Sequence, residues 1–99
     1  MLNIERKIIK DKAYFALAGR MDTITAPEFE ESLLESLEGV KELNLDFAEL
    51  DYISSAGLRV LLAAMKIMNK QGEMKICNVN ETIMEIFDVT GFTDILTIE

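Results

Sequence analysis

Histidine and tryptophan are absent from this sequence of 99 residues, and cysteine and proline each occur once. Without histidine there is no imidazole general base, no imidazole ligand for zinc, and no Ser-His-Asp or Cys-His arrangement. A serine nucleophile would need a lysine partner, but Lys66 and Lys70 are predicted to lie two or more helical turns beyond Ser55. We therefore expect that the protein is not an enzyme.

The single cysteine, Cys77, has no partner within the sequence for a disulfide bond. The stretch KICNV around it is typical of a strand, in which the thiol would pack as a small hydrophobic group. No histidine or flanking cation is placed to activate it, so we do not expect a reactive thiol.

Basic residues are scarce, with 10 Lys and Arg against 18 Asp and Glu, and the net charge is −8. This charge repels phosphate backbones, and no basic cluster offsets it locally, which argues against nucleic-acid binding. No apolar run approaches the roughly eighteen residues of a membrane span, and the N-terminus has no signal-peptide core. We expect a cytoplasmic protein that does not bind membranes.

Phosphate-binding glycine patterns are also missing, since neither GxxxxGK[ST] nor GxGxxG occurs. The acids Asp46 and Asp51 are interpreted as solvated groups rather than as a metal site, because their spacing does not indicate three converging ligands. We therefore expect no cofactor and no bound metal.

The periodicity of the apolar residues indicates one small α/β domain over residues 1–99. The predicted order is strand, strand, helix, strand, helix, strand, helix, strand. Parallel pairing through crossovers and an N-terminal antiparallel hairpin then give a small mixed, mostly parallel sheet with helices packed on it. The segments are strands 2–9, 13–19, 40–47, 73–79 and 94–98, and helices 25–39, 54–72 and 81–89.

The first helix has a capping-box pattern, in which Thr25 would be the N-cap and the Glu28 side chain would reach back to the backbone N–H of Thr25. The next helix has an apolar surface wider than one sheet contact requires, because Val60, Ala64 and Ile67 lie beside its main stripe. That extra surface is either covered by the neighbouring helix or exposed to a partner, and the sequence leaves both open.

The stretch DYISSAGLRVLL places two serines where this second helix begins. Ser54 is predicted to be the N-cap, with its hydroxyl accepting from the backbone N–H of Ala56 or Gly57. Ser55 is then the first helical residue, and its hydroxyl is free to face solvent near the positive end of the helix dipole. A serine here is either a plain structural residue or a site for regulation.

Phosphorylation of Ser55 would add nearly two negative charges at that point. The helix dipole favours an anion there by a few tenths to about one kcal/mol, whereas nearby acids would oppose it. These acids are expected to be Asp22, Asp46 and Asp51. Since the opposing effects are of similar size, a phosphate would leave the fold intact while changing the surface charge, as a binding switch requires.

The segment DYISSAGL resembles the phosphorylation loop of the STAS domain in bacterial anti-sigma factor antagonists. The residues matching the family motif are Ser54, Ser55, Ala56, Gly57 and Leu58. The segment GRMDTITA resembles a second family element, in which Asp22 occupies the aspartate position near the accepting serine. The resemblance implies that Ser55 accepts a phosphate and that the partner contacts Asp22, Ser55 and Arg59.

The resemblance also implies a partner-switching function. The unphosphorylated protein would bind an anti-sigma factor that is a serine kinase, phosphorylation would release it, and a serine phosphatase would restore binding. ATP and magnesium would belong to the kinase. The family often has an acid where this chain has Ser54, so two hydroxyls are offered to the kinase. The alternative is a non-switching STAS scaffold subunit of a stress-sensing or lipid-transport assembly.

Overall fold

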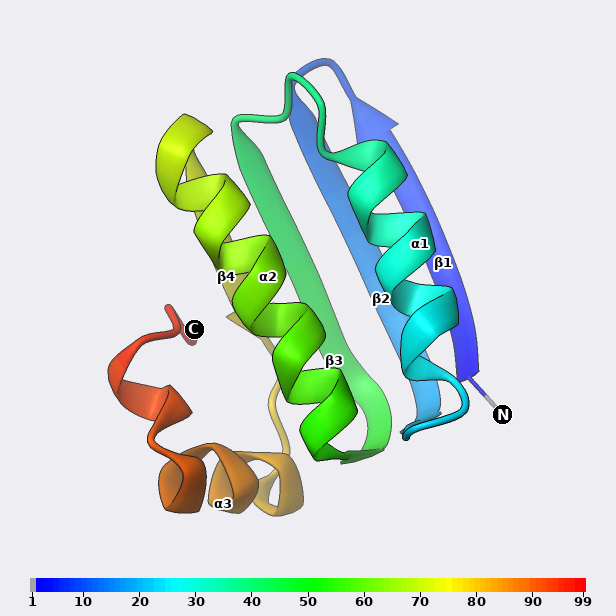
Figure 1. Ribbon diagram of the computed structural model, residues 1–99, viewed down its shortest axis with the longest axis vertical. Coiled ribbons are helices and arrows are strands. Elements are labelled where there is room, and N and C mark those ends of the chain that lie inside the picture. The colour runs from blue at the N-terminus through cyan, green and yellow to red at the C-terminus, as the bar shows by residue number, and fades with distance from the viewer. Residues whose placement is uncertain (1) are drawn as a thin grey trace.

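The computed structural model describes residues 2–99, which form one mixed sheet with helices on one of its faces (Figure 1). The strands lie in the order β1-β2-β3-β4, with β1 antiparallel to β2 and the other two pairs parallel. Their bounds are β1 Leu2–Ile9, β2 Lys12–Met21, β3 Glu42–Ile53 and β4 Glu73–Cys77. The predicted mixed α/β fold with an N-terminal hairpin is confirmed.

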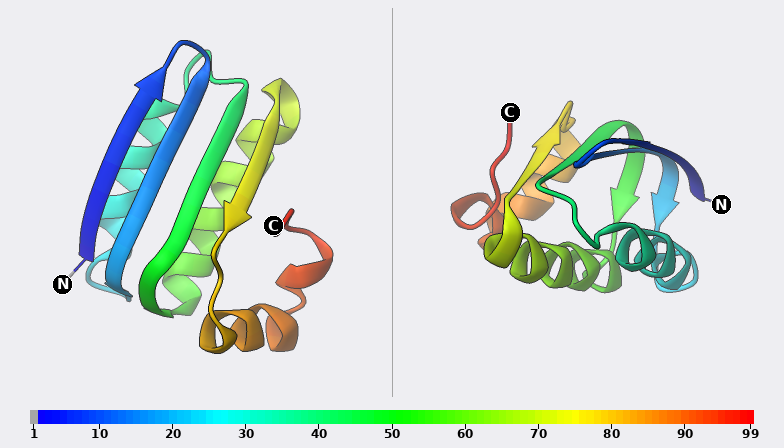
Figure 2. Two further views of the ribbon diagram at one scale, coloured as in Figure 1. Left: turned by 180° about the vertical axis from the view of Figure 1, so that it is seen from behind. Right: turned by 90° about the horizontal axis from the view of Figure 1, so that it is seen from above.

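Two long helices, α1 (Ala26–Ser36) and α2 (Ser55–Gln71), pack side by side on the same face of the sheet. Seen from behind, the strands lie in front of these helices, and no helix of residues 2–99 covers their other face (Figure 2). The shorter α3 (Glu81–Thr90) and the 3-10 turn η1 (Phe92–Asp94) lie at one end of the sheet. None of the described helices is both long and apolar enough to cross a membrane.

The core forms because alternate strand residues point to the helix-covered face. Leu43, Leu45 and Phe47 of β3 are fully buried, as the alternation predicts. They meet the apolar stripes of the helices, where Phe29 and Leu33 of α1 are fully buried as well. The sheet and the two long helices therefore share one core.

The second and third strands both extend further than the sequence predicts. Gly19 does not end β2 but sits in an irregularity of the β2–β3 ladder with φ of 104°, and the strand continues to Met21. Strand β3 passes Phe47 and ends at Ile53, with Leu50 and Ile53 buried. The bulges shift the inward positions away from strict alternation, which is why the pattern hides these extensions.

The predicted final strand over residues 94–98 is wrong for most of its length. The chain turns at Gly91, in the left-handed region with φ of 81°, and then forms η1. It therefore reaches the edge of β4 only at Ile98, which makes a single bridge with Ile76. The supporting bonds are Ile76 N–H to Thr97 O at 2.9 Å and Glu99 N–H to Ile76 O at 2.8 Å.

Candidate switch site at the start of helix α2

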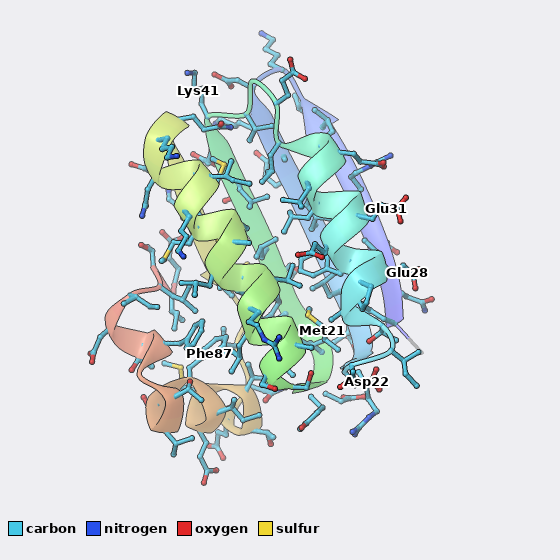
Figure 3. The ribbon with its side chains drawn as sticks, in the orientation of Figure 1. Met21, Asp22, Glu28, Glu31, Lys41 and Phe87 are labelled. Carbon is cyan, nitrogen blue, oxygen red and sulfur yellow. The ribbon has the colours of Figure 1, made fainter. Side chains whose placement is uncertain are left out.

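The parallel ladder brings the ends of β2 and β3 together at the start of α2. Met21 and Ile53 are paired neighbours, and the backbone N–H of Ser54 donates to Met21 O at 2.8 Å. Asp22, the next residue after Met21, therefore lies beside the start of α2, whereas Lys41 lies at the opposite end of the sheet (Figure 3). Two motifs separated by about thirty residues are thus joined by the β2–β3 pairing.

The two serines have different structural roles. Ser54 is the N-cap of α2, with an extended backbone (φ −92°, ψ 176°) and an Oγ that accepts from Gly57 N–H at 3.4 Å. Ser55 is the first helical residue and is exposed, and no hydrogen bond within residues 2–99 uses its hydroxyl. The predicted division between a capping serine and a free serine is confirmed.

The next three motif residues hold this helix start against the sheet. A Cβ on Gly57 would lie 2.6 Å from Ile53 Cγ1 and 2.8 Å from Met21 Sδ, so only glycine allows this approach. Leu58 is buried, and Ala56 is half-buried against the core. The position of Ser55 is therefore fixed by packing on both strand ends.

Asp22 organises the loop that leads into α1. Its Oδ1 accepts from the backbone N–H groups of Ile24 and Thr25, each at 3.0 Å, and from the Thr25 hydroxyl at 3.2 Å. The hydrogen bond from the Thr25 backbone is the main cause of a lowered Asp22 pKa, with smaller contributions from Ile24, the Thr25 hydroxyl and the charge of Arg20. Asp22 is therefore ionised at neutral pH and engaged within its own loop.

The predicted capping box of α1 is wrong. Thr25 has a helical backbone (φ −92°, ψ −23°) and makes no side-chain cap bond. Its hydroxyl instead donates to Arg20 O at 2.8 Å and accepts from Asp22 N–H at 2.9 Å. The carboxylate of Asp22 already accepts from the backbone N–H of Thr25, which is the group that Glu28 would bond in a capping box.

Arg59 lies one turn after Ser55, at the i+4 position on the same face of α2. It is exposed, and no ion pair or hydrogen bond between residues 2 and 99 involves it. A cation is therefore available beside the free hydroxyl of Ser55.

Of the acids expected around Ser55, Asp22 lies beside the start of α2 but Asp46 does not. Asp46 lies on the sheet face that no helix covers, because its neighbours Leu45 and Phe47 point into the core. Its Oδ1 accepts from Ala48 N–H at 2.9 Å and from Asn78 Nδ2 at 3.0 Å. Asp46 is therefore not part of the switch site. No group of three potential metal ligands occurs among the described residues.

The wide apolar surface of α2 belongs to the core. Val60 and Ala64 are 4% and 0% exposed, and Ile67 is half-buried against the same cluster. Of the two readings that the sequence left open, the structure supports coverage within the domain and contradicts an exposed strip. Ser55 therefore does not border an apolar helix face.

The loop after β2 carries an exposed apolar side chain that the sequence reasoning missed. Ile24, in the loop that Asp22 organises, is 86% exposed, the highest value among the large hydrophobic side chains of residues 2–99. An isoleucine between two threonines in a turn was the available signal.

Cys77 lies in β4 as predicted, but it is half-buried rather than part of the core. Burial is the main cause of a raised pKa of its thiol, and the charges of Asp46 and Glu99 add to the effect. The thiol is therefore protonated at neutral pH, which agrees with the expectation of an unreactive group.

A protein-family model described as the STAS domain matches residues 3–99. The chain belongs to the STAS domain family. The family fits the geometry described above, in which the SSAGL segment opens α2 and the GRMD segment closes β2.

STAS proteins of known role resemble the chain over nearly its full length. It is 31% identical over 98 residues to the anti-sigma-B factor antagonist of Bacillus subtilis strain 168, covering 98% of this chain and 90% of that protein. An anti-sigma factor antagonist from Mycobacterium paratuberculosis has the same fold, with a TM-score of 0.88, 16% identity, and coverage of 99% of this chain and 85% of that chain. The Bacillus cell fate determinant SpoIIAA in its phosphorylated form gives a TM-score of 0.75 at 16% identity, covering 100% and 91% of the two chains.

Proposed function

We propose that this STAS protein is an anti-sigma factor antagonist that acts by partner switching at Ser55. The unphosphorylated protein binds an anti-sigma factor that is also a serine kinase, and phosphorylation of Ser55 ends the interaction. A serine phosphatase restores the binding form. The protein acts in the cytoplasm as a binding protein, and ATP and magnesium are bound by the kinase.

The observation that carries this proposal is the exposed, unbonded hydroxyl of Ser55 beside an occupied cap. Because Ser54 already satisfies Gly57 N–H, a phosphate on Ser55 would displace no hydrogen bond of the helix start. The helix dipole would favour the phosphate by about 0.3–1 kcal/mol, and Arg59 lies within one turn. The domain can therefore stay folded in both states while the partner meets either a hydroxyl or a dianion.

The relatives support the same mechanism. The Bacillus subtilis relative is an anti-sigma-B factor antagonist, and SpoIIAA has been solved in a phosphorylated form. A phosphate of about −1.5 to −2 charges added to a surface with a net charge of −8 changes its electrostatics strongly at one point. A partner contact centred on Ser55 would then lose a buried polar contact and gain an unpaired charge.

The test uses a purified anti-sigma factor kinase from the same organism. We expect ATP to add one phosphate to the wild-type protein, mass spectrometry to assign it to Ser55, and Ser55→Ala to abolish it. The matched control is Ser54→Ala, which keeps the acceptor and should still be phosphorylated. A phosphate found on Ser54 would contradict the assignment.

Binding of the same kinase without ATP separates a switch from a scaffold. Ser55→Asp places a charge at the switch site and should weaken binding by about tenfold or more, equivalent to 1.4 kcal/mol. Unchanged affinity would favour the alternative of a non-switching STAS scaffold.

A further inference from the structure

The loop between β2 and α1 presents one apolar side chain to solvent. Ile24 is 86% exposed, against 79% for Val89 of α3 and 45% for Ile9 at the end of β1. Its side chain contributes little to the core, so folding alone gives no reason for an isoleucine at this position.

The backbone of Ile24 is held firmly even though its side chain is free. Its N–H donates to Asp22 Oδ1 at 3.0 Å, and the next N–H, that of Thr25, donates to the same oxygen. The Thr25 hydroxyl ties the loop back to Arg20 O at 2.8 Å. Because the backbone at Ile24 is already ordered, binding through this residue costs little backbone freedom, which favours affinity.

The loop lies directly beside the switch site. Met21 O accepts from Ser54 N–H, so only Asp22 and Thr23 separate that contact from Ile24 along the chain. Side chains that lie around a reactive hydroxyl are the ones that an enclosing partner must cover.

The charge around the loop indicates the character of that partner. Glu28 and Glu31 are exposed on α1 near the loop (Figure 3), and the chain as a whole has a net charge of −8. A complementary surface would offer an apolar pocket with basic side chains on the α1 side.

We infer that Ile24 is an anchor for the anti-sigma factor kinase, filling an apolar pocket of the kinase beside the entrance that receives Ser55. The inference rests on the proposed function and adds a specificity-determining residue to it. Ile24 touches no reacting atom, so it sets how tightly the kinase holds the protein and not how fast the phosphate is transferred.

The test compares Ile24→Ala with Ile9→Ala, which removes the same atoms from an exposed isoleucine. Ile9 pairs with Lys12 at the start of β2, about 30 Å from Met21 at its end. Binding to the purified kinase is measured without ATP by calorimetry, and phosphorylation is measured with ATP over a range of protein concentrations. Ile24→Leu serves as the conservative variant.

We expect Ile24→Ala to raise both the Kd and the KM by about tenfold or more, with kcat within about twofold of wild type. Ile9→Ala and Ile24→Leu should stay within about threefold of wild type in Kd, and all melting temperatures should be similar. A split between KM and kcat with unchanged stability would not arise from a purely structural role.

Ile24→Ala binding as tightly as wild type would overturn the anchor while leaving the switch at Ser55 intact. Self-association of the wild-type protein that is lost in Ile24→Ala would also overturn it, because the side chain would then serve contact between copies. Failure of the wild-type protein to bind the kinase or to accept phosphate would contradict the proposed function and this inference together.

Discussion

The two long helices begin at the same end of the sheet, each near a hydroxyl residue, but only one of the hydroxyls is a cap. At α2, Ser54 has an extended backbone and its Oγ reaches Gly57 N–H. At α1, Thr25 has a helical backbone, and its hydroxyl turns to Arg20 O and Asp22 N–H instead. The difference follows from the backbone, because the hydroxyl of an N-cap residue reaches the N–H two or three residues on when its backbone is extended, as at Ser54.

The two helices also differ in the residue that follows the cap position, which is Ala26 in α1 and Ser55 in α2. Thr25 is only 9% exposed, and its oxygen is used in both directions, so it offers nothing to a partner. At α2, Ser54 makes the cap bond, and the hydroxyl of the exposed Ser55 makes no hydrogen bond within residues 2–99. The loop before α1 is held by its own hydrogen bonds, whereas the start of α2 presents an exposed hydroxyl.

The close approach of α2 to the strands should give the largest effect on stability. Gly57→Ala places a Cβ 2.6 Å from Ile53 Cγ1 and 2.8 Å from Met21 Sδ, both on fully buried side chains. Such overpacking is expected to lower the free energy of unfolding by about 1–3 kcal/mol in urea titrations. Truncating Met21 to alanine in the same chain should make the Gly57→Ala cost smaller, and strictly additive costs would show that the contact with Met21 is not part of the cause.

The cap at α2 should give a smaller loss. Ser54→Ala removes the acceptor of Gly57 N–H and is expected to lower the free energy of unfolding by about 1 kcal/mol, with Ser54→Asp largely restoring it. Glu28→Ala is the matched change at α1, where no capping box exists, and should cost no more than about 0.5 kcal/mol. Equal losses at the two helices would contradict the contrast drawn between them.

The hydrogen bonds of Asp22 in the loop before α1 should make the stability of the fold depend on pH. Because the Asp22 pKa is lowered in the folded protein, its contribution to stability is complete above its unfolded value of about 4 and is lost as the pH falls through the folded value. Wild type should therefore exceed Asp22→Asn in urea midpoint at pH 7, and the gap should narrow towards pH 3. A gap of constant size would mean that the Asp22 charge has no part in holding the loop.

Much of the fold follows from local pattern. The alternation of Leu43, Leu45 and Phe47 and the caps Ser54 and Asn80 predict their elements correctly, and the Asn80 side chain accepts from Ile83 N–H at 2.9 Å. These features depend on interactions between residues a few positions apart, and the energies of such local interactions are similar in most surroundings.

Other features depend on contacts that the pattern does not contain. The end of β3 at Ile53 is decided by pairing with Met21 across a bulged ladder, and the final strand shrinks to one bridge because the chain arrives late at β4. The burial of Val60 and Ala64 depends on packing within the core of the domain. An amphipathic pattern shows which surface is apolar but not what covers it.

The sequence alone determined that Ser54 caps α2 and that Ser55 does not, because the capping hydrogen bond joins residues only three positions apart. Only the tertiary structure decided what surrounds Ser55. The β2–β3 ladder brings Asp22 to the start of α2 and leaves Asp46 on the uncovered face of the sheet. Residues far apart in the chain meet through strand register, and register is set by the packing of the whole core.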